Sequence, residues 1–367
     1  MPVPLILRWP QREAAHEKLI AALAPDQILG DEPVPGSVNR GLWPGVRSAP
    51  KRPGDSDVTS ASREPWVDAN GYLAAYERAL HPERPALLGH VHKNAEVGVP
   101  FDTLELALVE ARVHGGNFIL SVEPRYRAAL LAGEVKAKEA WQALARTAHW
   151  LRQHESLFGR PVVPALTALV EPGMATSEIA NLLHRRGGTP ALVPASKVPP
   201  PDPARRFVLV AAGLKAVPAA AYEHATAGAT VVIDGPPEAG WKVAKEEKDR
   251  VTFTHGKGQI VAYRKRVVDP SEFALDMIDL VTHRRRAARL WNATSAIPLA
   301  VEGGLLHIIQ YGAPLTGEIQ VRVQGHYAKA RLLRPEAAPV ELKVARRGTM
   351  TEVFPSAIRR LGVIQFE

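Results

Sequence analysis

The chain of 367 residues contains no cysteine. This absence excludes a disulfide scaffold, a thiolate metal site and a cysteine nucleophile. No apolar run approaches the ~20 residues that cross a bilayer. The first 13 residues lack the basic segment and the small-residue cleavage site of a signal peptide, so none is expected. The default expectation is therefore a cytoplasmic protein, or an exported one if a native leader is missing from the sequence.

Charge of either sign is moderate, with 46 basic and 38 acidic residues and a formal net charge of +8. Apolar residues make up 46% of the chain and charged residues 23%, which is typical of a folded globular protein. The basic balance permits an acidic partner. However, the basic runs at 264–266 and 284–286 are short, lie apart and are not interleaved with aromatic residues, as a single-strand binding groove requires. We expect neither a nucleic-acid nor a membrane partner.

Short apolar runs alternate with helical patterns in the first 160 residues. The runs lie at 4–9, 27–30, 86–92 and 117–122, and the helical patterns at 11–23, 68–80, 101–114 and 136–154. This alternation predicts a parallel sheet with right-handed crossovers. Residues 34–64 are rich in Pro, Gly and Ser and are predicted to form a long loop, which in a compact domain is usually functional or disordered.

The rest of the chain shows two further patterns. Residues 161–284 alternate strands and helices again, with an antiparallel pair across the Gly-Lys-Gly turn at 256–258, as in a flavodoxin-like domain. From about residue 289 the apolar period becomes two, and short strands at 305–310, 318–323, 328–333, 340–344 and 363–366 predict a small β-sandwich. The predicted division is therefore 1–160, 161–284 and 285–367.

The order of these blocks resembles clan-A β-galactosidases that carry a flavodoxin-like trimerisation domain and a C-terminal sandwich. Residues 115–124 (GGNFILSVEP) with the helix within 140–158 resemble the last strand and helix of the barrel. Residues 256–281 resemble the closing strand and helix of the trimerisation domain, and 305–335 resembles the sandwich of bacterial glycosidase-like proteins. The resemblance implies a bacterial, homo-oligomeric, TIM-barrel-like protein that acts on carbohydrate and needs no cofactor.

The barrel is predicted to be incomplete. A (β/α)8 barrel takes about 250 residues, and only about 160 precede the flavodoxin-like block, with four strand–helix units. Either the N-terminal half of a parent barrel is absent or the barrel is a reduced one.

Two glutamates are the predicted catalytic pair. Parallel barrels place the active site at the C-terminal ends of their strands. Glu32 and Glu123 each follow a predicted strand and precede proline, and glycosidases use two carboxylates. The Glu-Pro at 32–33 resembles the acid/base residue of clan-A enzymes, so we expect Glu32 as general acid/base and Glu123 as nucleophile or second carboxylate. A plain turn after the strand is the alternative for Glu32, since Asp and Pro are favoured there.

Other polar and aromatic residues near these strand ends are the predicted substrate contacts. Trp43 could be a flat platform for a sugar or a plug packed under the loop. Two arginines would suit an acidic sugar. The predicted set is Asp31, Asn39, Arg40, Trp43, His90, His92 and Arg125.

Two alternatives to a glycosidase stay open. His90 and His92 point to the same side of their strand, so a metal-dependent hydrolase is conceivable. Only Asp31 offers a further ligand, and we predict no metal. The second alternative is a non-catalytic carbohydrate-binding or assembly protein with a degenerate half-barrel. The sequence contains no Gly-x-Ser-x-Gly elbow and no P-loop motif.

Overall fold

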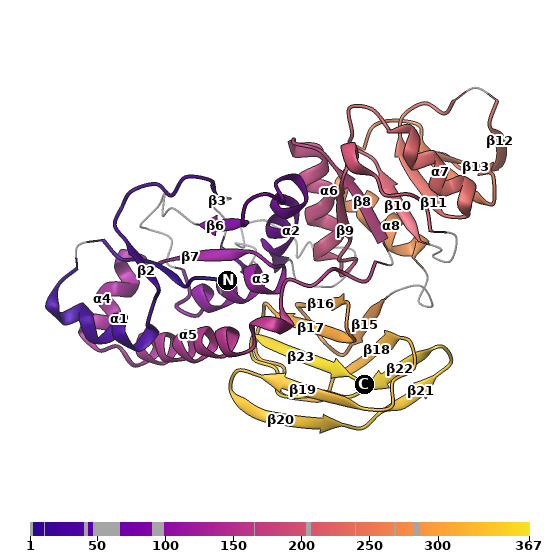
Figure 1. Cartoon of the computed structure of the whole chain (residues 1–367). Coiled ribbons are helices and arrows are strands. Elements are labelled where there is room, and N and C mark those ends of the chain that lie inside the picture. The colour runs from indigo at the N-terminus through magenta and orange to yellow at the C-terminus, as the bar shows by residue number, and fades with distance from the viewer. Residues whose placement is uncertain are drawn as a thin grey trace, which may run out of the picture.

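The computed structural model describes residues 3–10, 12–39, 43–46, 67–89, 99–164, 166–202, 207–238, 240–267, 269–281 and 287–367. These residues form three regions in chain order: a parallel sheet with helices, a second and larger sheet with helices, and a β-sandwich (Figure 1). The helices within the described ranges include none that is long and apolar enough to cross a membrane.

The first region, called the partial barrel, has a five-stranded sheet in the order β2-β1-β7-β6-β3, in which every pair is parallel. Its strands are β1 (Ile6–Arg8), β2 (Gln27–Leu29), β3 (Ser37–Asn39), β6 (Leu87–Gly89) and β7 (Asn117–Ser121). Its helices are η1 (Ala14–His16), α1 (Glu17–Leu23), α2 (Gly71–Leu80), α3 (Thr103–Val113), α4 (Pro124–Ala132), α5 (Val135–Gln153) and η2 (Glu155–Leu157), and β4 (Gly45–Val46) pairs with β5 (Val67–Asp68).

The parallel sheet is confirmed, but the count of four strands was wrong. β3 is a fifth strand, and it lies inside the segment predicted to be a loop. Its three residues, Ser-Val-Asn, are too few to show an apolar pattern. The strand exists because it pairs with β6, a tertiary contact that no local pattern reveals.

The strand order also shows where the barrel is interrupted. The first strand, β1, pairs with the last strand, β7, as the strands that close a sequential barrel do. The sheet opens instead between β2 and β3, each of which pairs on one side only among the described strands. Among the described strands, the interruption therefore falls in the middle of the strand order, and whether part of a parent barrel is absent from the sequence stays open.

The second region, called the flavodoxin-like region, has parallel strands in the order β9-β8-β10-β11-β14, which is the 2-1-3-4-5 order of flavodoxin. These strands are β8 (Leu166–Val170), β9 (Ala191–Pro194), β10 (Val208–Ala211), β11 (Thr230–Asp234) and β14 (Gly258–Tyr263). Antiparallel β13 (Arg250–His255) and β12 (Lys242–Glu246) extend the sheet. Helices α6 (Met174–Arg185) and α8 (Pro270–Leu280) cover one face, α7 (Ala219–Ala227) covers the other, and η3 (Ala195–Lys197) follows β9.

The third region, called the sandwich, consists of two antiparallel sheets with an apolar core between them. One sheet has the order β16-β17-β23-β19-β20 and the other β15-β18-β22-β21. The strands are β15 (Ala288–Trp291), β16 (Ala296–Val301), β17 (Leu305–Gln310), β18 (Gln320–Gln324), β19 (Ala330–Arg334), β20 (Ala337–Leu342), β21 (Ala345–Arg347), β22 (Met350–Val353) and β23 (Leu361–Phe366). The predicted sandwich is confirmed. The exact division of the chain into independently folding domains stays a prediction.

Helix α3 joins the partial barrel to the sandwich. All 11 of its residues are buried. Its leucines share one apolar core with β7 and with residues of β16, β17 and β23, such as Leu299, Leu305 and Val363. The two regions are therefore one packed body, and the charged side chains of α3 must find partners inside it.

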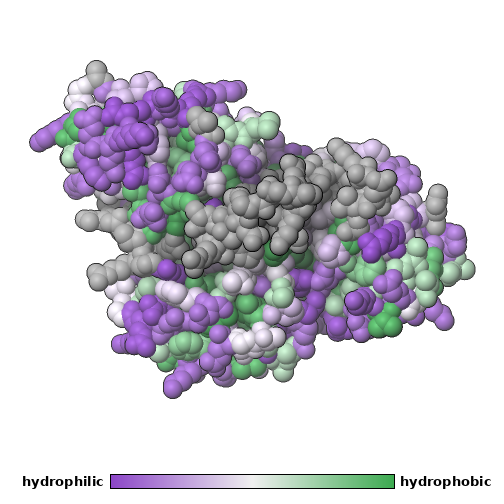
Figure 2. Space-filling view, turned by 180° about the vertical axis from the view of Figure 1, so that it is seen from behind, coloured by the Kyte–Doolittle hydropathy of each residue, from purple (hydrophilic) through white to green (hydrophobic). Residues whose placement is uncertain are grey.

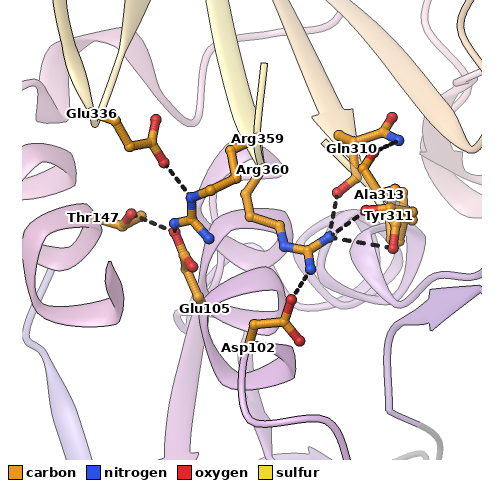
Figure 3. Close-up of polar contacts among 10 residues, drawn as sticks. Asp102, Glu105, Thr147, Gln310, Tyr311, Ala313, Glu336, Arg359 and Arg360 are labelled. Atoms are coloured by element: carbon orange, nitrogen blue, oxygen red, sulfur yellow. Dashed lines mark hydrogen bonds and ion pairs between the residues drawn. The ribbon is translucent and has the colours of Figure 1, made fainter. Parts of the chain in front are cut away.

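Two arginines of the sandwich meet two carboxylates of the helical layer (Figure 3). Arg359 pairs with Glu105, which also accepts a hydrogen bond of 2.6 Å from the Thr147 hydroxyl. The Arg359 Nε lies 2.8 Å from Glu336 Oε1. Glu105 is fully buried, so Arg359 supplies the positive charge that makes its burial possible.

The neighbouring arginine holds the start of α3. Arg360 pairs with Asp102, the residue before the helix. Its other amino group donates to the carbonyl oxygens of Gly312 at 2.8 Å and Gln310 at 3.3 Å. A single guanidinium group thus ties the end of β17 to the N-terminus of α3.

We expect Arg359→Met to destabilise the protein by about 3 kcal/mol, because it leaves the buried Glu105 carboxylate without its counter-charge. The matched control is Arg264→Met, since Arg264 pairs with Glu246 where both side chains are largely exposed. The control should cost less than about 1 kcal/mol. Urea unfolding followed by fluorescence measures both, and equal losses would contradict the role given to Arg359.

Candidate functional site

Glu32 lies just beyond the C-terminal end of β2, and its side chain is exposed. The Arg8 guanidinium, at the end of the neighbouring strand β1, donates to the Glu32 carbonyl oxygen at 3.0 Å. A Cβ added at Gly30 would lie 2.7 Å from Glu32 Oε2, so this glycine leaves room for the carboxylate to fold back over the strand end. Asp31 precedes it in the same exposed turn.

Glu123 lies two residues beyond β7, at the N-cap of α4, and is half-buried. The helix begins there because Pro124 occupies its first position, where the missing N–H costs nothing. Beside it, the Arg127 guanidinium donates to the Pro10 carbonyl oxygen at 2.8 Å, which ties the start of α4 to the chain leaving β1.

The strands that carry the two glutamates both flank β1. At about 4.8 Å per strand, β2 and β7 are about 10 Å apart. Glu32 and Glu123 therefore occupy the same edge of the sheet, with Arg8 between their strands. Two glutamate side chains can reach one ligand across such a distance, and Arg8 would offer a positive charge between them.

Trp43 and Arg125 lie near the start of α3. Trp43 is half-buried and contacts Phe118 of β7 edge-on, with ring centroids 6.1 Å apart. It also lines a cavity of about 430 Å3 together with Asp68, Asp102 and Arg360.

The Arg125 guanidinium lies 5.7 Å from the centroid of the Phe101 ring, which stacks on Tyr126. Phe101 lines a second cavity, of about 620 Å3, which shares Pro100 and Asp102 with the Trp43 cavity. The N-terminus of α3 thus separates two hollows.

Three of the predicted contacts, Arg40, His90 and His92, lie outside the described residues, and only the backbone of Asn39 is described. Their grouping with Glu32 and Glu123 stays a prediction. Within the described ranges, no group of three or more His, Asp or Glu side chains is placed to hold a metal ion.

A buried polar cluster where the three regions meet was not predicted. Glu110 of α3 accepts hydrogen bonds at Oε2 from the backbone N–H of Asn70 at 2.9 Å and of Gly71 at 3.2 Å. The Tyr311 hydroxyl, from the sandwich, lies 3.0 Å from the same oxygen. His114 contacts His184 of α6 edge-on, with centroids 4.8 Å apart.

An ion pair completes the junction between regions: Arg185 of α6 pairs with Asp68 of β5. The sequence signal for this cluster is that α3, a mostly apolar helix, carries three charged residues, Glu105, Glu110 and Arg112.

Burial controls the protonation of this cluster. It raises the pKa of Glu110 to about 7, against the opposing effect of its hydrogen bonds with Asn70, Tyr311 and Gly71. Burial lowers the pKa of His114 to about 4 and that of His184 well below its ordinary value. Both histidines are therefore neutral at neutral pH, and Glu110 exchanges its proton near neutrality.

No protein-family model matches the chain, and no curated protein matches its sequence. Solved structures do match. One is α-L-fucosidase isoenzyme 2 from Paenibacillus thiaminolyticus, with a TM-score of 0.51 and 8% identity over 81% of this chain and 63% of that one. A GH42 β-galactosidase from G. stearothermophilus has a TM-score of 0.50 and 11% identity over 81% and 56%.

A third match is the β-galactosidase from Bacillus circulans sp. alkalophilus, with a TM-score of 0.51 and 8% identity over 81% and 58%. The chain spans less than two thirds of the length of each of these proteins. The chain shares a glycoside hydrolase-like fold with these proteins. The predicted resemblance is therefore confirmed for the fold.

The raised pKa of Glu110 predicts a pH-dependent stability. The folded state holds this proton more tightly than the unfolded state, whose pKa is near 4.5. The tighter proton binding by Glu110 therefore stabilises the folded state fully below pH 4.5. This stabilisation, about 3 kcal/mol in total, is lost as the pH rises to about 7. The free energy of unfolding of Glu110→Gln, relative to the unmodified protein, should thus rise by up to that amount between pH 4.5 and 7.5.

Urea unfolding at several pH values measures this difference, in which the histidine contributions cancel. Glu17→Gln, at an exposed position of α1, is the matched control. Its free energy of unfolding should differ from that of the unmodified protein by the same amount at every pH. A flat difference for Glu110→Gln as well would contradict the assignment.

Proposed function

We propose that the protein is a glycoside hydrolase-like protein that acts on carbohydrate at the C-terminal edge of the partial-barrel sheet. The observation that carries the proposal is the position of Glu32 and Glu123 beyond strands that flank β1, in a chain with the fold of glycoside hydrolases. Barrels of this kind build their sites at that edge.

In the proposed reaction, Glu32 protonates the leaving oxygen as the glycosidic bond breaks. Glu123 either attacks the anomeric carbon to form a glycosyl ester that water then hydrolyses, or is the second carboxylate that takes a proton from the attacking water. Retaining enzymes hold the two carboxyls about 5–5.5 Å apart and inverting ones about 6.5–9.5 Å apart, so their distance in a complex would decide the outcome. Asp31, Asn39, Arg40, His90 and His92 would hold hydroxyl groups. Trp43 and Arg125 would contact the substrate farther from the reacting bond. Arg40 and Arg125 would suit an acidic sugar.

A second candidate is a non-catalytic carbohydrate-binding or assembly protein. Two observations favour it: the sheet is open between β2 and β3 among the described strands, and the Glu32 side chain is exposed. A general acid normally gains its proton affinity from a dry pocket, which an exposed turn does not supply.

Hydrolysis of a panel of aryl glycosides and aryl glycuronides tests the proposal. We expect turnover that falls by at least about 100-fold in Glu32→Gln and in Glu123→Gln, because general acid catalysis alone contributes about 10²–10⁴-fold. Glu341→Gln, at an exposed position of β20 in the sandwich, should leave turnover unchanged.

Turnover that both variants retain would overturn the carboxylate pair. Binding of oligosaccharides without any turnover would establish the second candidate instead.

We also propose that the chain self-associates. Free sheet edges invite pairing, and closed symmetry is its usual result. The edge strand β12 is unsuitable, because its five residues are exposed and include Lys242, Lys245 and Glu246. Hydrophilic side chains cover much of the flavodoxin-like region, at the upper left of Figure 2. The edges at β2 and β3 are better candidates.

Light scattering at micromolar concentration and about 0.15 M salt should return two or three times the chain mass of 39.8 kDa. The salt weakens repulsion between chains that each carry a net charge of +8. A mass of one chain would contradict self-association.

A further inference from the structure

A cavity of about 650 Å3 lies between the partial barrel and the flavodoxin-like region, away from the two glutamates. Two of its lining residues lie just before strands of this sheet: Ala86 immediately precedes β6, and Gly115 lies two residues before β7. The cavity therefore adjoins the N-terminal edge of the sheet, whereas Glu32 and Glu123 lie at the C-terminal edge. Its other walls come from α2, from the linker at 160–162 and from the start of β9.

Three arginines line this cavity: Arg78, Arg84 and Arg160. The only carboxylate among the lining residues is Glu83, whose Oε1 lies 3.5 Å from His81. Arg84 is neutralised by Glu77, 3.1 Å away. The cavity wall therefore carries an excess of positive charge.

Arg78 and Arg160 form no ion pair with any carboxylate of the described residues and bind only backbone oxygens. Arg78 donates to the carbonyls of His114 at 2.8 Å and Gly159 at 3.2 Å. Arg160 donates to those of Ser156 at 2.9 Å and Glu302 at 3.4 Å. Each guanidinium has five N–H donors, so both keep donors to spare.

Glycines hold these two arginines in place. Gly115 and Gly303 have φ values of +73° and +85°, which residues with a side chain rarely adopt. A Cβ at Gly115 would lie 2.2 Å from Arg78 Nη1, and a Cβ at Gly303 would lie 2.2 Å from Arg160 Nη1. Each guanidinium thus rests directly on backbone. The side chains are already ordered, so binding a ligand would cost little further entropy.

We propose that this cavity binds an anionic small molecule through a carboxylate or phosphate group held by Arg78 and Arg160. Guanidinium groups bind both kinds of oxyanion by paired, charge-assisted hydrogen bonds. The volume lies in the range of small-molecule sites. Prolines 82, 85, 161 and 190 also line the cavity and would contact the neutral part of the ligand. The site would be separate from the proposed catalytic edge and does not depend on it.

Isothermal titration of the full chain tests this proposal with three probes: inorganic phosphate, galacturonate and, as the neutral match, galactose. We expect phosphate or galacturonate to bind, with an affinity that falls as sodium chloride is added. Binding of phosphate alone would assign the site to phosphate esters, and binding of galacturonate alone to carboxylates.

Variants then locate the binding. Arg160→Gln should weaken it about tenfold or more, which corresponds to one lost hydrogen bond to a charged group. Ala79 lines the cavity, so Ala79→Glu should weaken binding through repulsion while its neutral match, Ala79→Gln, should not. This pair keeps the test decisive if Arg160→Gln does not fold. Arg264→Gln, away from the cavity, should bind normally.

Three results would overturn the proposal: no binding of either anion, binding of galactose as tight as that of galacturonate, or anion binding that Arg160→Gln and Ala79→Glu leave unchanged. The last result would mean that these arginines serve only to tie backbone carbonyls together.

Discussion

The complete burial of α3 is the constraint on which the rest of the structure depends. The helix carries Glu105, Glu110 and Arg112 into an apolar core, where an unpaired charge costs several kcal/mol. Glu105 and Glu110 find partners in the sandwich, Arg359 and Tyr311, whereas Arg112 donates to the carbonyl oxygens of residues 3 and 4 of the partial barrel. The sandwich cannot leave the partial barrel without stranding the two glutamates.

This junction explains how an incomplete barrel can be a folded unit. In a closed barrel every strand is paired on both sides and the helices form an outer ring. Among the described strands the sheet stops here at β2 and β3, so closure between them contributes nothing to its stability. The sandwich supplies the missing burial by packing on the helical layer, and its core is continuous with that of the sheet.

The same arrangement separates three kinds of environment. The strand ends that carry Glu32 and Glu123 lie at one edge of the sheet. The buried cluster around Glu110 lies within the junction, where low polarity controls protonation. The arginine cavity lies at the opposite edge, where α2, the 160–162 linker and β9 converge. A ligand at either edge would contact elements that the junction holds in fixed positions.

The sequence by itself determined the class of each region, because apolar period and turn residues are local properties. It determined the parallel sheets at 6–121 and 166–263 and the period-two strands of the sandwich, and it placed Glu32 and Glu123 at strand ends. The tertiary structure alone decided the strand β3, the pairing of β1 with β7, the burial of Glu110 beside Tyr311 and the arginine cavity. Each of these brings together residues distant in sequence, and one sequence carries no record of which distant segments meet.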